Sequence, residues 1–174
     1  MDKKVVSKSD FTGIPLATMR NYLKFEATDA TEDALITQLM KSAVDQIENR
    51  CNIALRETAL SIIFDEFDIC DSRVILPVAP YVSLTKAYVV DTSGNETESE
   101  YKVIGATTPE VYIPTYIDGY KIKIEYTARY TSIPDLAITA ILKQVADWYE
   151  NRGDATLNAE VRKMCNELSY QPWI

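Results

Sequence analysis

The sequence predicts an α+β fold in which a helical bundle carries an inserted small antiparallel β-sheet. Two helical blocks, residues 14–55 and 132–168, flank a central segment, residues 56–131, in which the hydrophobic period changes from that of a helix to that of a strand. Eight of the eleven tyrosines lie between Tyr81 and Tyr130, as expected for a small sheet with amphipathic faces. With 174 residues and a hydrophobic share of 47%, the whole chain fits one domain with a substantial core.

The N-terminal part is predicted to be an arm followed by a helical hairpin. Residues 1–13 are polar and without periodicity, which is typical of a flexible arm that orders on contact with a partner. Pro15 suits the first turn of a short helix over about 16–24, because its fixed φ is helical and its missing N–H needs no partner there.

The second helix of the hairpin is predicted from helical spacing and from its start signals. Asp29 and Thr31 are both good N-cap residues, and the helix is expected to end near Arg50. The residues that repeat at helical spacing are Leu35, Ile36, Leu39, Met40, Ala43, Val44 and Ile47.

From Glu57 onward the apolar residues alternate with a period of two, which predicts strands. The predicted strands are Thr58–Phe64, Val82–Val90, Tyr101–Ile104, Glu110–Ile113 and Tyr120–Tyr130. Turn residues separate them, including the glycines at Gly94 and Gly119.

Two further helices and a tail complete the chain. Ser132 is the expected cap of a long helix that has Pro134 in its first turn and ends at Gly153. Thr156 is the expected cap of a last helix, and residues 169–174 form a tail without a charged side chain.

Charge and composition exclude several classes of protein. The formal net charge is −8, and residues 26–72 hold 11 acids against 3 bases, so the chain lacks the basic stripe with which a protein grips nucleic acid phosphates. The longest apolar run, Val74–Leu84, contains two prolines and is too short to cross a bilayer, and Met1–Ser7 has no apolar stretch of a signal peptide. Three widely separated cysteines, at 51, 70 and 165, are expected to be reduced and partly buried.

The sequence points to no catalytic, cofactor or metal site. It contains no histidine, and its five glycines stand singly, so no phosphate-binding loop exists. The one dense group of metal-capable oxygens has neither the glycine nor the distal glutamate of a calcium loop. It is interpreted as a solvated turn after an edge strand, with a divalent-metal or nuclease site as the alternative. The group consists of Asp65, Glu66, Asp68 and Asp71.

The order of the segments resembles the head-tail connector (adaptor, or head-completion) proteins of tailed bacteriophages, in the longer branch with a β insert. The opening helices resemble the family in the stretches Leu16–Lys24, Asp33–Leu39 and Ile47–Arg50. Later similar landmarks are Val74–Ser83, the turn from Asp91 to Gly94, Ile133-Pro134 and Trp148–Arg152. The resemblance covers about residues 14–168.

The resemblance implies a structural virion protein of the neck, made in the host cytoplasm. Such a protein forms a homo-oligomeric ring, typically of twelve subunits, beneath the portal protein. The ring extends the channel for genomic double-stranded DNA, which passes without sequence-specific binding, and offers a docking surface for a stopper or tail-completion protein. The alternatives left open are a metal-dependent nuclease or hydrolase that uses the Asp65–Asp71 cluster, and another phage neck or tail-completion protein.

The C-terminal tail is the candidate partner-binding site. It places large apolar side chains on a chain end, and aromatic anchors of this kind often supply most of the binding energy of an interface. We expect the tail to dock on the portal or on a neighbouring subunit, and the alternative is that it folds back on its own helices. The residues concerned are Tyr170, Trp173 and Ile174.

Overall fold

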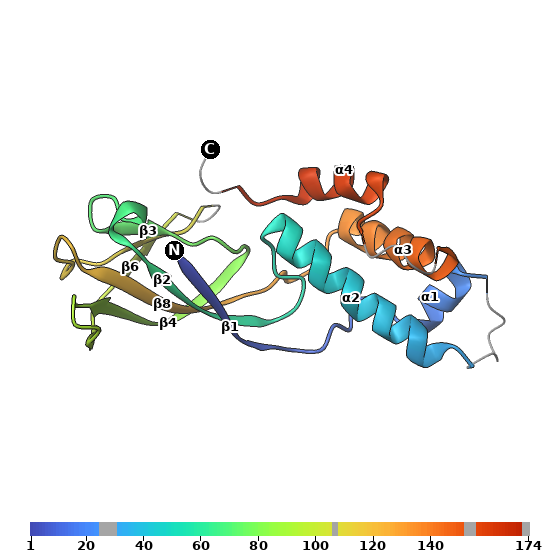
Figure 1. Cartoon of the computed structure of the whole chain (residues 1–174), viewed down its shortest axis with the longest axis horizontal. Coiled ribbons are helices and arrows are strands. Elements are labelled where there is room, and N and C mark those ends of the chain that lie inside the picture. Colours follow the sequence, from blue (N-terminus) through green and yellow to red (C-terminus); the bar gives the residue numbers. More distant parts are fainter. Residues whose placement is uncertain (25–30, 106–107, 152–155, 172–174) are drawn as a thin grey trace. The chain divides into compact units, whose positions relative to one another are not determined.

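The computed structural model describes residues 1–24, 31–105, 108–151 and 156–171. It confirms the predicted α+β class, with helices and antiparallel sheets in separate parts of the chain. Two compact units are present. One contains Met1–Ser9 and Arg56–Tyr130 and holds the strands; the other contains Asp10–Leu55 and Thr131–Tyr170 and holds the four helices (Figure 1).

The helical unit is built around two long helices. These are α2 (Asp33–Cys51) and α3 (Asp135–Glu150), which lie side by side, with α4 (Ala159–Leu168) packed along α3 (Figure 1). The short helix α1 (Leu16–Tyr22) contacts both long helices and buries Met19 completely.

The core of this unit comes from one face of each helix, as the helical spacing predicts. The buried side chains of α2 are Ile36, Met40, Ala43, Val44, Ile47, Glu48 and Cys51. Those of α3 are Ala137, Ala140, Ile141, Gln144, Val145 and Trp148. A bidentate ion pair between Arg20 and Asp33 also ties α1 to the start of α2.

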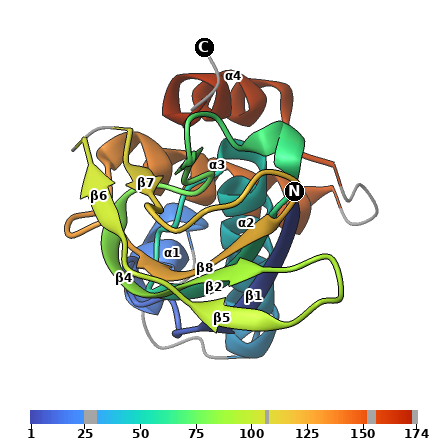
Figure 2. The same ribbon diagram turned by 90° about the vertical axis from the view of Figure 1, so that its left-hand side faces the viewer.

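The β unit contains two antiparallel sheets. The larger sheet has the order β1-β2-β8-β4-β5 (Figure 2). The smaller sheet has the order β3-β7-β6. The strands of the larger sheet are β1 (Asp2–Lys8), β2 (Thr58–Phe64), β8 (Lys121–Ala128), β4 (Tyr81–Val90) and β5 (Glu96–Glu98). Those of the smaller sheet are β3 (Arg73–Ile75), β7 (Glu110–Tyr112) and β6 (Lys102–Ile104).

The centre of the larger sheet is the core of the β unit. After the exposed Lys121 at the start of β8, both β2 and β8 alternate between buried and half-buried residues. Their register pairs Leu60 with Tyr126, Ile62 with Ile124 and Phe64 with Ile122. Each of these pairs is buried. The Tyr126 hydroxyl satisfies the backbone of buried Val78, accepting from its N–H at 3.1 Å and donating to its carbonyl oxygen at 3.3 Å. These two hydrogen bonds explain how a tyrosine is accommodated in an apolar core.

The structure differs from the sequence-based expectation for residues 1–13. Instead of a flexible arm, residues 2–8 form β1, which pairs antiparallel with β2. Because β1 covers the outer side of β2, the acidic turn after β2 does not follow an edge strand, and that part of the prediction is wrong. No sequence pattern marks β1 as a strand, because residues 2–7 are exposed and apolar and polar residues do not alternate along it.

The expected helix caps also differ. The residue that precedes α3 is Pro134, not Ser132, and it supplies no side-chain cap. The cap of α4 is Asn158, whose side-chain oxygen accepts from the Glu160 N–H at 2.8 Å, and not Thr156. The expected features at Asp29 and Gly153 lie outside the described residues.

Candidate assembly surfaces

The root of the C-terminal tail is anchored within the helical unit. The Tyr170 N–H donates a 2.8 Å hydrogen bond to the carbonyl oxygen of Cys51, the last residue of α2. Tyr170 itself is half-buried. The two other predicted anchors, Trp173 and Ile174, lie outside the described residues. The structure therefore places the start of the tail at the C-terminal end of α2 and describes the chain as far as Gln171.

A partly buried polar network positions α4 beside α3. The Gln144 side chain, with no exposed surface, accepts from the Asn158 N–H at 2.8 Å and donates to the Thr156 carbonyl oxygen at 3.3 Å. The Trp148 indole N–H donates to the same Thr156 carbonyl at 3.1 Å. Thr156, expected to cap α4 through its side chain, thus contributes its carbonyl instead. This network fixes where α4 starts, and hence where the tail starts.

Two buried cysteines lie at the other end of α4. Cys51 and Cys165 have no exposed surface, and the Cys51 thiol lies 3.5 Å from the Cys165 carbonyl oxygen. A hydrogen bond to Cys165 and burial raise the pKa of Cys51. The Cys51 thiol therefore stays protonated and acts as a small apolar residue that packs the ends of α2 and α4. The third cysteine, Cys70, is exposed, whereas all three were expected to be partly buried.

The acidic turn after β2 is held by internal contacts. Asp65 and Asp68 form a reciprocal capping box around the 3-10 turn η1 (Glu66–Asp68). The Lys121 ammonium group lies 2.8 Å from the Asp65 carboxylate, and this contact lowers the pKa of Asp65. The Met1 amino group lies 3.0 Å from Asp65 and 2.9 Å from Asp68. The turn thus uses its carboxylates to bind cations of the chain itself.

No group of three or more acidic or cysteine side chains that could hold a metal ion is found within the described part of the chain.

The acidic turn after β2 also exposes an aromatic side chain, since Phe67 is 92% exposed. Phe67 borders an open recess of about 420 Å³ that Tyr116 and Gly119 also line. Desolvation and the nearby acids Asp118 and Glu66 raise the pKa of Tyr116.

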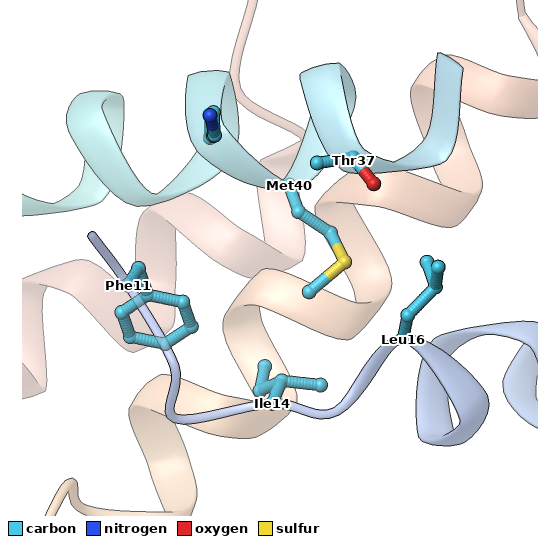
Figure 3. Close-up of a pocket in the computed structure, with 6 residues that line it drawn as sticks. Phe11, Ile14, Leu16, Thr37 and Met40 are labelled. Carbon is cyan, nitrogen blue, oxygen red and sulfur yellow. The ribbon is translucent and has the colours of Figure 1, made fainter. Parts of the chain in front are cut away.

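A small apolar recess lies in the helical unit between the segment before α1 and α2. Its volume is about 200 Å³. Phe11, Ile14 and Leu16 face Met40 across it (Figure 3). Gly13 stands between Phe11 and Ile14 because a Cβ there would lie 2.0 Å from the Ile133 side chain. The absence of a side chain at Gly13 thus allows the segment before α1 to pass close to Ile133.

The two edges of the larger sheet carry opposite charge. β1 is rich in lysine, and β5 consists of Glu96, Thr97 and Glu98. One face of the sheet next to β5 bears a charged ladder, in which Lys123 lies 2.8 Å from Glu96 and Lys86 lies 3.3 Å from Glu98. Sequence reasoning missed both edges; the available signal was the reversal of charge between residues 2–8 and 96–100.

A family model described as "Head completion protein" matches residues 15–158. The chain belongs to the head completion protein family. This confirms the resemblance predicted from the order of the segments, and it identifies a structural virion protein with a head-tail connector role. No match was found among the curated proteins.

Solved structures similar to this head completion protein come from gene transfer agent (GTA) particles. The neck of an empty GTA particle, computed with C6 symmetry, contains a chain with a TM-score of 0.77 and 22% identity, covering 98% of this chain and 96% of that one. The virion of a native GTA particle gives a TM-score of 0.75 at 21% identity, with 98% and 96% covered. The neck of a native particle, computed with C12 symmetry, gives 0.73 at 20% identity, with the same coverage. The fold is thus shared over nearly the full length.

Among the described residues, no helix is both long enough and apolar enough to span a membrane.

Proposed function

We propose that this head completion protein is a non-enzymatic adaptor that assembles as a ring, of twelve copies when complete, beneath the portal protein. The two compact units act together as one connector domain over residues 1–174. The observation that carries the proposal is the shared fold over 98% of the chain with chains of particle necks, two of them computed with C6 and C12 symmetry. In that position the ring extends the channel and offers its far side to a stopper or tail-completion protein.

The charge of the chain suits a channel through which double-stranded DNA passes. Basic walls would hold the phosphates and slow their passage, whereas acidic walls repel them and keep the duplex mobile. The chain has a formal net charge of −8. We propose that exposed carboxylates of its acidic segment, residues 26–72, face the channel and that DNA passes without sequence-specific contacts.

The C-terminal tail is the proposed contact with the portal or a neighbouring subunit. The anchors are Tyr170, Trp173 and Ile174, with Tyr170 fixed to the end of α2 by its backbone hydrogen bond. That bond supports the proposal because it gives the following residues a fixed starting point, which lowers the entropy lost on docking.

Electron microscopy of negatively stained protein, alone and mixed with the portal protein of the same particle, tests the ring. We expect rings in at least the mixture. Protein that stays monomeric under both conditions would refute the adaptor proposal. Incubation of DNA with the protein and magnesium or manganese tests the nuclease alternative, and we expect no cleavage.

Truncation tests the tail. Deleting residues 169–174 removes the Tyr170 hydrogen bond as well as the anchors, so the sharper variant is Trp173→Ser with Ile174→Ser, which keeps Tyr170. Docking predicts an unchanged melting temperature and lost portal binding or ring formation. A lower melting temperature would show instead that the tail folds back on its own subunit, and normal assembly at an unchanged melting temperature would refute docking.

A further inference from the structure

The larger sheet ends in two strands whose charges are complementary. The first edge strand, β1, holds three lysines and one aspartate, and β5 with the two residues after it holds three glutamates and no basic residue. The lysines are Lys3, Lys4 and Lys8. The glutamates are Glu96, Glu98 and Glu100.

The basic edge is open to a partner. Within the described residues, β1 pairs with β2 on one side only, and its residues 2–7 are exposed. Lys3 and Lys4 have no ion-pair partner within the part of the chain that the structure describes. Between the lysines stand Val5 and Val6, which are 42% and 60% exposed. The edge thus presents a short apolar strip with positive charges beside it.

The acidic edge is open as well. In the part of the chain that the structure describes, β5 pairs only with β4, and its three residues are exposed. Glu96 and Glu98 each place one carboxylate oxygen on a lysine of the sheet, which leaves the second oxygen of each uncommitted to those lysines. Glu98 is 61% exposed in its side chain, and Glu100 is exposed. The edge therefore stays negative despite its internal ion pairs.

We propose that these two edges meet in the ring, so that β1 of one copy lies against β5 of the next copy. This inference rests on the proposed ring and names its contact. Because the two edges differ, the contact is heterologous: each copy offers one edge of each kind to its two neighbours, and repetition closes a ring when the rotation between copies divides a full turn. Two like edges would oppose lysine to lysine or glutamate to glutamate, which is unfavourable and disfavours a two-fold dimer.

The contact is short and depends mainly on side chains. The register of β1 against β2 shifts between Val5 and Ser7, so only residues 2–5 form a regular edge. This regular edge of four residues is one residue longer than β5, which has three. A bulge and lysines on an edge strand also discourage pairing with unrelated strands, whereas an edge rich in glutamate turns the same lysines into an attraction.

Reversal of charge in pairs tests the contact. Lys3→Glu with Lys4→Glu makes both edges acidic, and Glu98→Lys with Glu100→Lys makes both edges basic. Each variant alone is expected to need an about tenfold or higher concentration for half-assembly, because like charges now face each other. A mixture of equal amounts of the two variants is expected to assemble again, since acidic and basic edges then alternate around the ring.

Matched controls change the net charge equally on exposed positions of the helices. Lys41→Glu with Lys163→Glu matches the acidic variant, and Glu150→Lys with Glu167→Lys matches the basic one; all four side chains are exposed or half-exposed on α2, α3 and α4. Both controls are expected to assemble like the parent. The measurements are sedimentation velocity and negative-stain microscopy, each with and without portal protein. In 1 M salt, where the screening length falls to about 3 Å, the difference between parent and variants is expected to shrink.

Each outcome either supports or overturns the proposed contact between β1 and β5. Rings of the parent with failure of the single variants and recovery of the mixture support the contact. Rings of either variant alone at the parent's concentration overturn it and leave the proposed function standing. Failure of the mixture also overturns it, because the edges then do not recognise each other. A parent that forms no ring, alone or on portal protein, overturns the proposed function and this contact together.

Discussion

Gln144 offers a sharp test of how the helical unit positions the tail. Its amide makes two hydrogen bonds to the segment that leads into α4, at 2.8 Å to the Asn158 N–H and 3.3 Å to the Thr156 carbonyl oxygen. The side chain has no exposed surface. Gln144→Leu keeps the volume and the apolar contacts but removes both bonds.

The expected cost follows from what is left unpaired. Loss of the bond to Thr156 costs about 0.5–1.5 kcal/mol, and leaving the Asn158 N–H without its partner costs about 1–3 kcal/mol. The Thr156 carbonyl keeps its bond from Trp148, so the one new orphan is the Asn158 N–H. We therefore expect a loss of roughly 2–4 kcal/mol, or about 5–15 °C in melting temperature for a chain of this size.

Thermal unfolding followed by circular dichroism measures the loss, and amide hydrogen exchange locates it. The Asn158 amide of Gln144→Leu should exchange faster, while the amides of β2 and β8 should exchange as in the parent. Lys143→Ala is the control, because Lys143 also joins α3 to α4 through a 2.5 Å ion pair with Glu160. This pair is exposed to solvent, where ion pairs contribute little to the free energy of unfolding. A variant Gln144→Leu that melted with the parent would show that the network does not hold α4.

Two further changes test the buried face of α3 and the acidic turn. Ile141→Asp places an unpaired charge at a fully buried position and should cost about 3–5 kcal/mol, whereas Thr139→Asp on the exposed side of the same helix should melt nearly with the parent. Calorimetry should show no tight binding of magnesium, manganese or calcium by the parent. Replacement of the four turn carboxylates by amides should leave the fold intact. A micromolar metal site that these replacements abolish would contradict the interpretation of this segment as a solvated turn. The four residues are Asp65, Glu66, Asp68 and Asp71.

The parts of the fold that the sequence predicted are those that bury one face. In β2 and β8, apolar and polar residues alternate because one side of each strand faces the core, and the paired residues Ile62 and Ile124 show that this alternation is in register. The faces of α2 and α3 were predictable for the same reason, with a period of 3.6 in place of two. Burial of one face therefore produces a hydrophobic period that can be recognised in a single sequence.

The strands that were not predicted from the sequence have no such hydrophobic period. β1 and β5 are exposed edge strands, and neither alternates between apolar and polar residues. β3 has three residues, too few for a period to be recognised, and its burial depends on the pairing of Val74 with Val111. The pairings of these strands are decided by neighbours distant in sequence.

The helix starts show how tertiary contacts override local preference. Ser132 and Thr156 are good cap residues by type, yet the structure begins α3 after Pro134 and caps α4 with Asn158. The Thr156 carbonyl is committed to Gln144 and Trp148, and its position along the chain follows from those bonds. A buried glutamine on α3 therefore helps to select the first turn of α4, two residues beyond the cap that composition favours.

Burial also explains why the family and the fold could be predicted from the sequence, whereas the assembly surfaces could not. A residue that contacts another copy is exposed in its own subunit, so Lys3 or Glu98 is indistinguishable, within one chain, from a residue that only meets water. What distinguishes a contact is complementarity between two distant segments of the same chain, and this becomes visible once the strand order places both at the edges of one sheet. Paired charge reversal is therefore more informative than single substitution, because only a contact between those two edges predicts that two defective variants assemble together.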